Sequence, residues 1–231
     1  MSADHVAAGA RDALDGRAAM LRDIREEVAY TRHEIGKDAL DAQVMAVIAR
    51  VPREQFIPAP GRFHAFANGP VPIGHGQTIS QPYIVALMTD LLAARPDSVI
   101  LEIGTGSGYQ AAVLAEVVRQ VYSVEIIGAL AESAGALLAR LGYANVMVRH
   151  ADGYQGWAEH APFDGILVTA AAPHVPPPLI EQLKPGGRLV IPIGLPGHVQ
   201  QLKVIEKLAD GTARSRDVLR VAFVPLTGAL R

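Results

Sequence analysis

The feature that most constrains the fold of this chain is a strict alternation of apolar strand patterns and helix patterns along its middle. The alternating segments are residues 98–103, 109–118, 120–125, 128–141 and 145–150. Short apolar runs that alternate with helical patterns are typical of βαβ units, in which successive strands are parallel and helices cover the sheet. The alternation therefore predicts an α/β fold with a parallel sheet and helices on both faces.

The same kind of pattern continues to the end of the chain. The predicted elements are strands at 163–169, 188–193, 200–208 and 218–226, a helix at 178–183 and a Lys-Pro-Gly-Gly turn at 184–187. Together with the three strands before them, they predict a mostly parallel sheet of about seven strands.

The first eighty residues have a different character. Apolar residues at helical spacing form two stripes, which are Met20, Leu21, Ile24 and Val28, then Leu40, Val44, Val47, Ile48 and Val51. Proline and glycine are so frequent in residues 56–76 that no regular element is expected there, and irregular segments often carry sites. We therefore divide the chain into a helical cover with a substrate-binding segment at 1–80 and a core at 81–231.

A glycine-rich turn follows the first strand of the alternating run. Gly104, Gly106 and Gly108 lie at the carboxyl end of that strand, where open α/β sheets bind ligands, and glycine lets the backbone approach a ligand closely. The dinucleotide pattern G-x-G-x-x-G fails at Tyr109, whereas the frame shifted to Gly106, Gly108 and Ala111 fits G-x-G-x-x-A. A nicotinamide cofactor therefore stays an alternative at this point.

Acidic residues end the next two strands. Glu125 lies about twenty residues after the glycines, where a carboxylate accepts hydrogen bonds from ribose hydroxyls. Asp152, followed by Gly153, ends the third strand, where an acid would reach an adenine edge rather than a pyrophosphate. The two acids together favour S-adenosylmethionine over a dinucleotide.

Charge and composition exclude several classes of function. The formal net charge is −2 and no basic run stands out, so neither nucleic acid nor an anionic membrane is expected as a partner. The chain has no cysteine, which excludes disulfides, thiolate metal sites and cysteine nucleophiles, and its scattered histidines predict no metal site. Because neither a signal-peptide pattern nor a long apolar span is present, we expect a cytoplasmic protein.

One stretch is much more specific than these patterns. Residues 71–83 read Val-Pro-Ile-Gly-His-Gly-Gln-Thr-Ile-Ser-Gln-Pro-Tyr and closely resemble the protein-L-isoaspartate methyltransferase family. The resemblance covers about residue 38 to the end. It implies a Rossmann-like, class I S-adenosylmethionine-dependent methyltransferase, a monomer, with a helical cover and a rearranged sheet end. The implied activity is methylation of the free α-carboxyl of L-isoaspartyl residues in damaged proteins and peptides, which starts their repair through a succinimide.

The resemblance also implies roles for individual residues. Ser80 matches the active-site serine of the family. The positions expected to bind S-adenosylmethionine are Gln77, Thr78, Ile79, Gly104, Thr105, Gly106, Glu125, Asp152, Gly153 and Thr227. Two departures stand out, since Val85 replaces a histidine that some members have, and the chain ends four residues after Thr227.

Three alternatives remain open from the sequence. The first is a carboxyl methyltransferase that acts on an aspartate of a biosynthetic peptide or on a small molecule. The second is a cofactor-binding protein without catalysis, which the intact stretch from Gln77 to Ser80 argues against. The third is a nicotinamide-dependent oxidoreductase.

Overall fold

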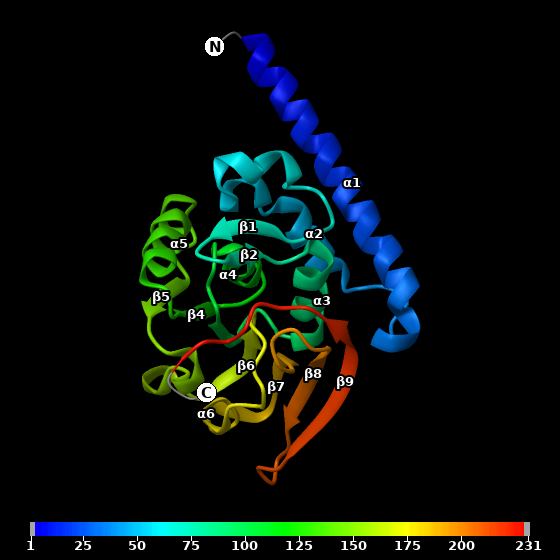
Figure 1. Cartoon of the computed structure of the whole chain (residues 1–231). Helices are drawn as coiled ribbons and strands as arrows, with labels where there is room; N and C mark the ends of the chain where they lie inside the picture. Colours follow the sequence, from blue (N-terminus) through cyan, green and yellow to red (C-terminus); the bar gives the residue numbers. More distant parts are fainter. Residues whose placement is uncertain (1–2, 229–231) are drawn as a thin grey trace.

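A computed structural model describes the backbone of residues 3–228 and the side chains of residues 14–228, so residues 1–2 and 229–231 of the two predicted segments lie outside it. The strands of its main sheet are β3 (Val99–Ile103), β4 (Gln120–Glu125), β5 (Val146–His150), β6 (Phe163–Val168), β7 (Leu183–Ile193), β8 (Gln200–Lys207) and β9 (Ala213–Val221). Within the described residues these seven strands lie in the order β5-β4-β3-β6-β7-β8-β9 (Figure 1). The predicted fold class is confirmed.

The sheet has a parallel part and an antiparallel part. Strands β5, β4, β3, β6 and β7 are parallel, whereas β8 and β9 each pair antiparallel with their neighbour. After β5 the chain crosses back over the sheet and enters β6 on the other side of β3. The strand order therefore reverses beside β3, and a crevice at such a point binds ligands in open α/β sheets.

Apolar side chains on the two faces of the sheet form two cores. The helices are α1 (Ala3–Ile35), α2 (Ala42–Arg50), α3 (Pro82–Leu92), α4 (Tyr109–Ala115), α5 (Gly128–Arg140) and α6 (Pro177–Glu181). The larger core joins α1 to α5 with one face of the sheet, while α6 and the segment around Trp157 cover the other face. The long α1, blue in Figure 1, contacts α2, α3 and β9. Both predicted apolar stripes lie in the larger core, and only Leu21 is less than fully buried.

The segment at 56–76 is more regular than we expected. It contains the short helix η2 (Ala59–His64) and the strand β1 (Val71–Gly74), which pairs antiparallel with β2 (Gln77–Ile79). Two glycines, Gly74 and Gly76, adopt positive φ in the turn between these strands. The expectation of no regular element was wrong because strands of three and four residues are too short to produce a visible alternation among so many prolines and glycines.

Two strand boundaries also differ from the prediction. Strand β7 begins at Leu183 and includes the expected turn, because Gly187 lacks a side chain and its backbone passes close to the Asp164 carbonyl at an irregular register. Strand β9 begins at Ala213, five residues earlier than predicted, and ends at Val221. Its first five residues are exposed and four of them, residues 214–217, are polar, so apolar patterning did not reveal them. The residues after Val221 instead lie along the end of the sheet.

None of the helices in the described part of the chain is both long and apolar enough to span a membrane.

Candidate functional site

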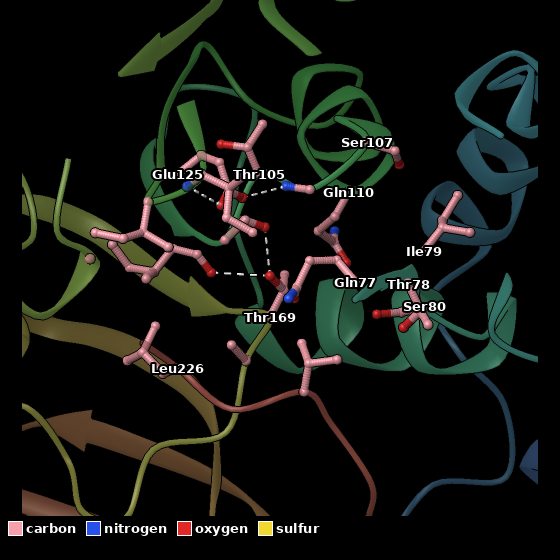
Figure 2. Close-up of a pocket in the computed structure, with 18 of the residues that line it drawn as sticks. Gln77, Thr78, Ile79, Ser80, Thr105, Ser107, Gln110, Glu125, Thr169 and Leu226 are labelled. Carbon is pink, nitrogen blue, oxygen red and sulfur yellow. Dashed lines mark hydrogen bonds between the residues drawn. The ribbon is translucent and has the colours of Figure 1, made fainter. Parts of the chain in front are cut away.

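A cavity of about 750 Å³, counted with the part open to solvent, lies at the carboxyl ends of β3, β4 and β6. Its lining comprises Gln77, Thr78, Ile79, Ser80, Val85, Ile103, Gly104, Thr105, Gly106, Ser107, Tyr109, Gln110, Val124, Glu125, Ile126, Ile127, Gly153, Thr169, Ala170, Val224, Pro225, Leu226 and Thr227. The structure thus brings all the predicted site residues except Asp152 to one cavity. In Figure 2, Glu125 and Thr105 lie on one side of the cavity, and Thr78 and Ser80 lie on the opposite side.

The glycine-rich turn that begins at Gly104, called the glycine loop below, forms the first wall of this cavity together with Glu125. Gly104 adopts φ +93°, and a Cβ at this position would lie 2.3 Å from the Thr169 hydroxyl. Only glycine fits here, because the conformation is strained for other residues and the neighbouring strand is too close. The Thr169 hydroxyl donates a hydrogen bond to the Gly104 carbonyl at 2.6 Å, so it joins the ends of β3 and β6.

Glu125 ends β4 and holds the loop from the side. Its side chain is buried, with one oxygen accepting the Gly106 N–H at 2.8 Å and the other accepting the Ile127 N–H at 3.0 Å. A carboxylate offers about four acceptor sites, so two of them stay available to hydroxyls of a ligand. This is the arrangement that ribose recognition requires.

A buried hydrogen-bonded chain lies behind this wall. The Thr105 hydroxyl is 2.6 Å from the Ser123 hydroxyl, which is also hydrogen-bonded to the Glu102 carboxyl. Glu102 is fully buried, and its second oxygen has no hydrogen-bond partner in the described part of the chain. Burial, opposed by the hydrogen bond from Ser123 and helped by the nearby Glu125 carboxylate, raises the pKa of Glu102 to about 8. Glu102 is therefore mostly neutral at pH 7.

The opposite wall comes from the hairpin and the residue after it. Gln77, Thr78 and Ile79 form β2, and Ser80 follows directly before α3. The Ser80 carbonyl accepts a hydrogen bond from Arg53 at 2.8 Å, while its hydroxyl bonds to no other described residue. The Ser80 hydroxyl can therefore donate a hydrogen bond to a ligand.

The residues after β9 close a third side. Ala171, in the loop after β6, exchanges backbone hydrogen bonds with this segment, from its N–H to the Val224 carbonyl and from the Leu226 N–H to its own carbonyl, each at 2.8 Å. The Gln200 side chain fixes the start of the segment through both backbone groups of Phe223. These bonds carry Thr227 to the cavity.

Asp152 lies outside the lining. Its carboxylate accepts the Tyr154 N–H at 2.9 Å and caps the short helix η3 (Gly153–Gln155). A Cβ on Gly228 would lie 2.3 Å from one of its oxygens, so the Gly228 backbone packs against this carboxylate. Its neighbour Gly153 does line the cavity. The expected contact between Asp152 and an adenine edge stays a prediction.

A second, wider groove opens beside the cavity. It encloses about 1150 Å³ with its open part, between α1, the start of α3 and the β9 end of the sheet. Thr78, Ser80, Thr169 and Val224 line both spaces, so the two meet at these residues. The site can thus hold one ligand in the cavity and place another, in the groove, against it.

Sequence reasoning missed Thr169 and Gln110 as lining residues. Thr169 directly follows β6, whose carboxyl end lies beside the glycine loop, so its position after an apolar strand could have revealed it. Gln110 had no such signal, because it lies inside α4 and bonds to Thr89 of α3. No group of three histidine or acidic side chains that could hold a metal occurs among the residues that the structure describes.

Comparisons with known proteins agree with this geometry. The family model described as protein-L-isoaspartate(D-aspartate) O-methyltransferase matches residues 29–231. The chain is 62% identical over 224 residues to protein-L-isoaspartate O-methyltransferase 2 of Syntrophobacter fumaroxidans, covering 96% of this chain and 91% of that relative. It is 56% identical to protein-L-isoaspartate O-methyltransferase 1 of Cupriavidus necator, covering 92% and 82%.

Two solved structures resemble the whole arrangement. A structure named protein-L-isoaspartate O-methyltransferase superimposes with a TM-score of 0.76 at 29% identity, covering 89% of this chain and 67% of the other. A protein-L-isoaspartate O-methyltransferase structure from Plasmodium falciparum, in complex with S-adenosyl-L-homocysteine, gives 0.72 at 26% identity, covering 89% and 97%. With a family model that matches most of its length and relatives above 50% identity, this chain belongs to the protein-L-isoaspartate(D-aspartate) O-methyltransferase family.

Proposed function

We propose that this protein transfers a methyl group from S-adenosylmethionine to the free α-carboxyl of L-isoaspartyl residues in damaged proteins and peptides. The observation that carries the proposal is the meeting of the cavity and the groove at Ser80 and Thr169. A methyl donor in the cavity and a carboxylate in the groove would face each other there. Membership in the family supports this choice of donor and acceptor.

The residues of the cavity fit the donor. The glycine loop leaves space for a ligand at Gly106, where a Cβ would meet only the Ile73 side chain, at 3.5 Å. Glu125 has spare acceptor sites for ribose hydroxyls, and Ile126 and Ile127 offer apolar surface beside it. We assign Gln77, Thr78, Ile79, Gly153 and Thr227 to the remaining contacts. When bound there, S-adenosylmethionine supplies an electrophilic methyl group on a positively charged sulfur.

The acceptor needs placement rather than activation. A carboxyl with a pKa near 4 is ionised at neutral pH, so no general base is required to make it a nucleophile. Orientation of bound reactants can contribute roughly 7 to 11 kcal/mol of barrier reduction in favourable cases. We assign this task to Ser80, whose hydroxyl would donate a hydrogen bond to the isoaspartyl carboxylate. Ser80 is thus an orienting group and forms no covalent bond.

Repair would follow outside the enzyme. The methyl ester is a better target than the carboxylate for the next peptide nitrogen, whose attack expels methanol and closes a succinimide ring. Hydrolysis of this ring partly restores a normal aspartyl bond. The expected monomeric state and cytoplasmic location stay predictions from the sequence.

A pair of synthetic peptides that differ in one residue tests the proposal. One contains L-isoaspartate and the other L-aspartate, and the transfer of labelled methyl from S-adenosylmethionine is measured for each. Base-labile label on the isoaspartyl peptide alone is the expected result. Label on neither peptide, despite binding of S-adenosylhomocysteine, would contradict the proposal and indicate another carboxylate substrate.

A further inference from the structure

Arg53 is a buried cation next to the proposed active site. It lies at the start of the short helix η1 (Arg53–Phe56) and its side chain is 0% exposed. Its Nη2 donates to the Ser80 carbonyl at 2.8 Å, and its Nε donates to the Ala65 carbonyl at 2.9 Å. Burial lowers the pKa of Arg53. A charge buried against backbone carbonyls rather than a carboxylate is costly, so the buried position of Arg53 calls for an explanation.

The same guanidinium also contacts the cofactor side of the site. Its Cζ lies 4.8 Å from the centre of the Tyr109 ring, within the range of a cation–π interaction. Tyr109 begins α4 directly after the glycine loop and lines the cavity. The ring of Phe56 packs edge-on against Tyr109 at 5.6 Å. Arg53 thus joins Ser80 to the helix that follows the glycine loop.

This bridge links parts of the chain that no strand pairing connects. Ser80 lies beyond the end of β2, and its hydroxyl has no partner among the described residues, so the carbonyl contact helps to set where the hydroxyl points. Tyr109 is 56 positions from Arg53 along the sequence but touches the same guanidinium. A misplacement of about 1 Å at a reacting centre can reduce a rate about a hundredfold.

We propose that Arg53 is a positioning residue of this active site, which places the Ser80 hydroxyl relative to the glycine loop by holding the Ser80 carbonyl and the Tyr109 ring at once. This inference rests on the proposed function of Ser80. Arg53 lines neither the cavity nor the groove and acts through its neighbours.

A double-mutant cycle separates positioning from a general contribution to folding. Arg53→Ala, Ser80→Ala and the double variant are assayed for kcat and KM with the isoaspartyl peptide. In the wild-type background, Arg53→Ala should lower kcat/KM about thirtyfold, the loss expected when the Ser80 hydroxyl itself is removed. In the Ser80→Ala background it should lower it less than about fivefold, because the group that Arg53 places is absent. Equal losses in both backgrounds would overturn the proposal.

Arg53→Lys serves where the alanine variant fails to fold. Lysine keeps the charge but is a compact donor that lacks the planar fork needed to reach two carbonyls and stack on a ring. A folded Arg53→Lys protein should lose at least about tenfold in kcat/KM, and full activity would contradict the inference. The matched control is Arg62→Lys, because Arg62 is exposed and its Nε donates to the Ile57 carbonyl, away from Ser80. The control should keep its activity.

Amide hydrogen exchange tests the contact without any substrate. Exchange over residues 77–81 should become faster in Arg53→Lys and stay unchanged in Arg62→Lys. Unchanged exchange in both variants would overturn the positioning role, whatever the substrate. A wild-type protein that labels neither peptide would contradict the proposed function instead, so the two failures are distinguishable.

Discussion

The two walls of the cavity are held in different ways. The wall of Gly104, Thr105 and Glu125 consists of the ends of paired parallel strands, so the sheet itself sets its position. The wall that ends in Ser80 belongs to a two-stranded hairpin outside the main sheet. Val71 and Ile79 pack the hairpin into the larger core, and Arg53 links its end to α4 through the Ser80 carbonyl and the Tyr109 ring. The first wall should therefore tolerate distant changes better than the second.

The buried Glu102 behind the first wall offers the largest expected effect. Its pKa is raised to about 8 in the folded protein, above the ordinary value of 4.5. As the pH rises from 4.5, the unfolded chain loses this proton first, so the free energy of unfolding falls until about pH 8, by up to about 5 kcal/mol. Glu102→Gln should remove this loss, and urea unfolding at pH 5, 6.5 and 8 measures it.

Other groups also titrate over this pH range. The quantity to compare is therefore the difference in the free energy of unfolding between the Glu102→Gln variant and the wild type. The variant should gain stability relative to the wild type with each step in pH. Glu132→Gln, on the exposed side of α5, is the control and should run parallel to the wild type. If the free energy of unfolding of Glu102→Gln changed with pH in the same way as that of the wild type, Glu102 would not be neutral in the folded protein.

Glu125→Gln should break the first wall alone. The amide places an NH₂ group against either the Gly106 or the Ile127 N–H, and it loses the charge that strengthens both hydrogen bonds. Hydrogen bonds to charged groups are worth about 1.5 to 3 kcal/mol, so the Kd of S-adenosylhomocysteine should rise roughly 10- to 150-fold. Isothermal titration calorimetry measures this change in Kd, and Glu132→Gln is again the control. An unchanged Kd would remove Glu125 from the proposed binding residues.

Ser80→Ala should break the second wall alone. Loss of one hydrogen bond to a carboxylate should cost about 2 kcal/mol of transition-state stabilisation and lower kcat/KM for the isoaspartyl peptide roughly 30-fold. The Kd of S-adenosylhomocysteine should change little. Ser133→Ala, an exposed serine on α5, is the matched control. The opposite split, with weak cofactor binding and normal turnover of bound substrate, would make Ser80 a cofactor residue.

Thr169→Val has the smallest expected effect. It tests the point where the cavity and the groove meet. Thr169 lines both the cavity and the groove, and its hydroxyl bonds to the Gly104 carbonyl. Valine keeps the shape and removes the one hydroxyl hydrogen that the Gly104 and Ile103 carbonyls share, a loss of about 1 kcal/mol. Both the Kd of S-adenosylhomocysteine and the KM for the peptide should rise about fivefold. A change in the Kd alone would assign Thr169 to the cavity, and a change in the KM alone would assign it to the groove.

Much of the first wall was predictable because its positions follow from local pattern. Parallel strands end at the same edge of a sheet, so a glycine turn after one strand and an acid after the next must lie close together. Gly104 and Glu125 could be placed in this way before any coordinate was known. The resemblance of residues 71–83 to a known family added Ser80, which periodicity alone would not have revealed.

What the sequence by itself determined is the alternation of strands and helices, the glycine turn and the acid that faces it, because each depends on neighbours within a few turns or strands. Only the tertiary structure decided that Arg53 contacts Ser80, that Thr169 bonds to Gly104, and that Gly228 packs against Asp152. These contacts join residues 27 to 76 positions apart. Their geometry depends on how packed elements meet, which no local pattern specifies.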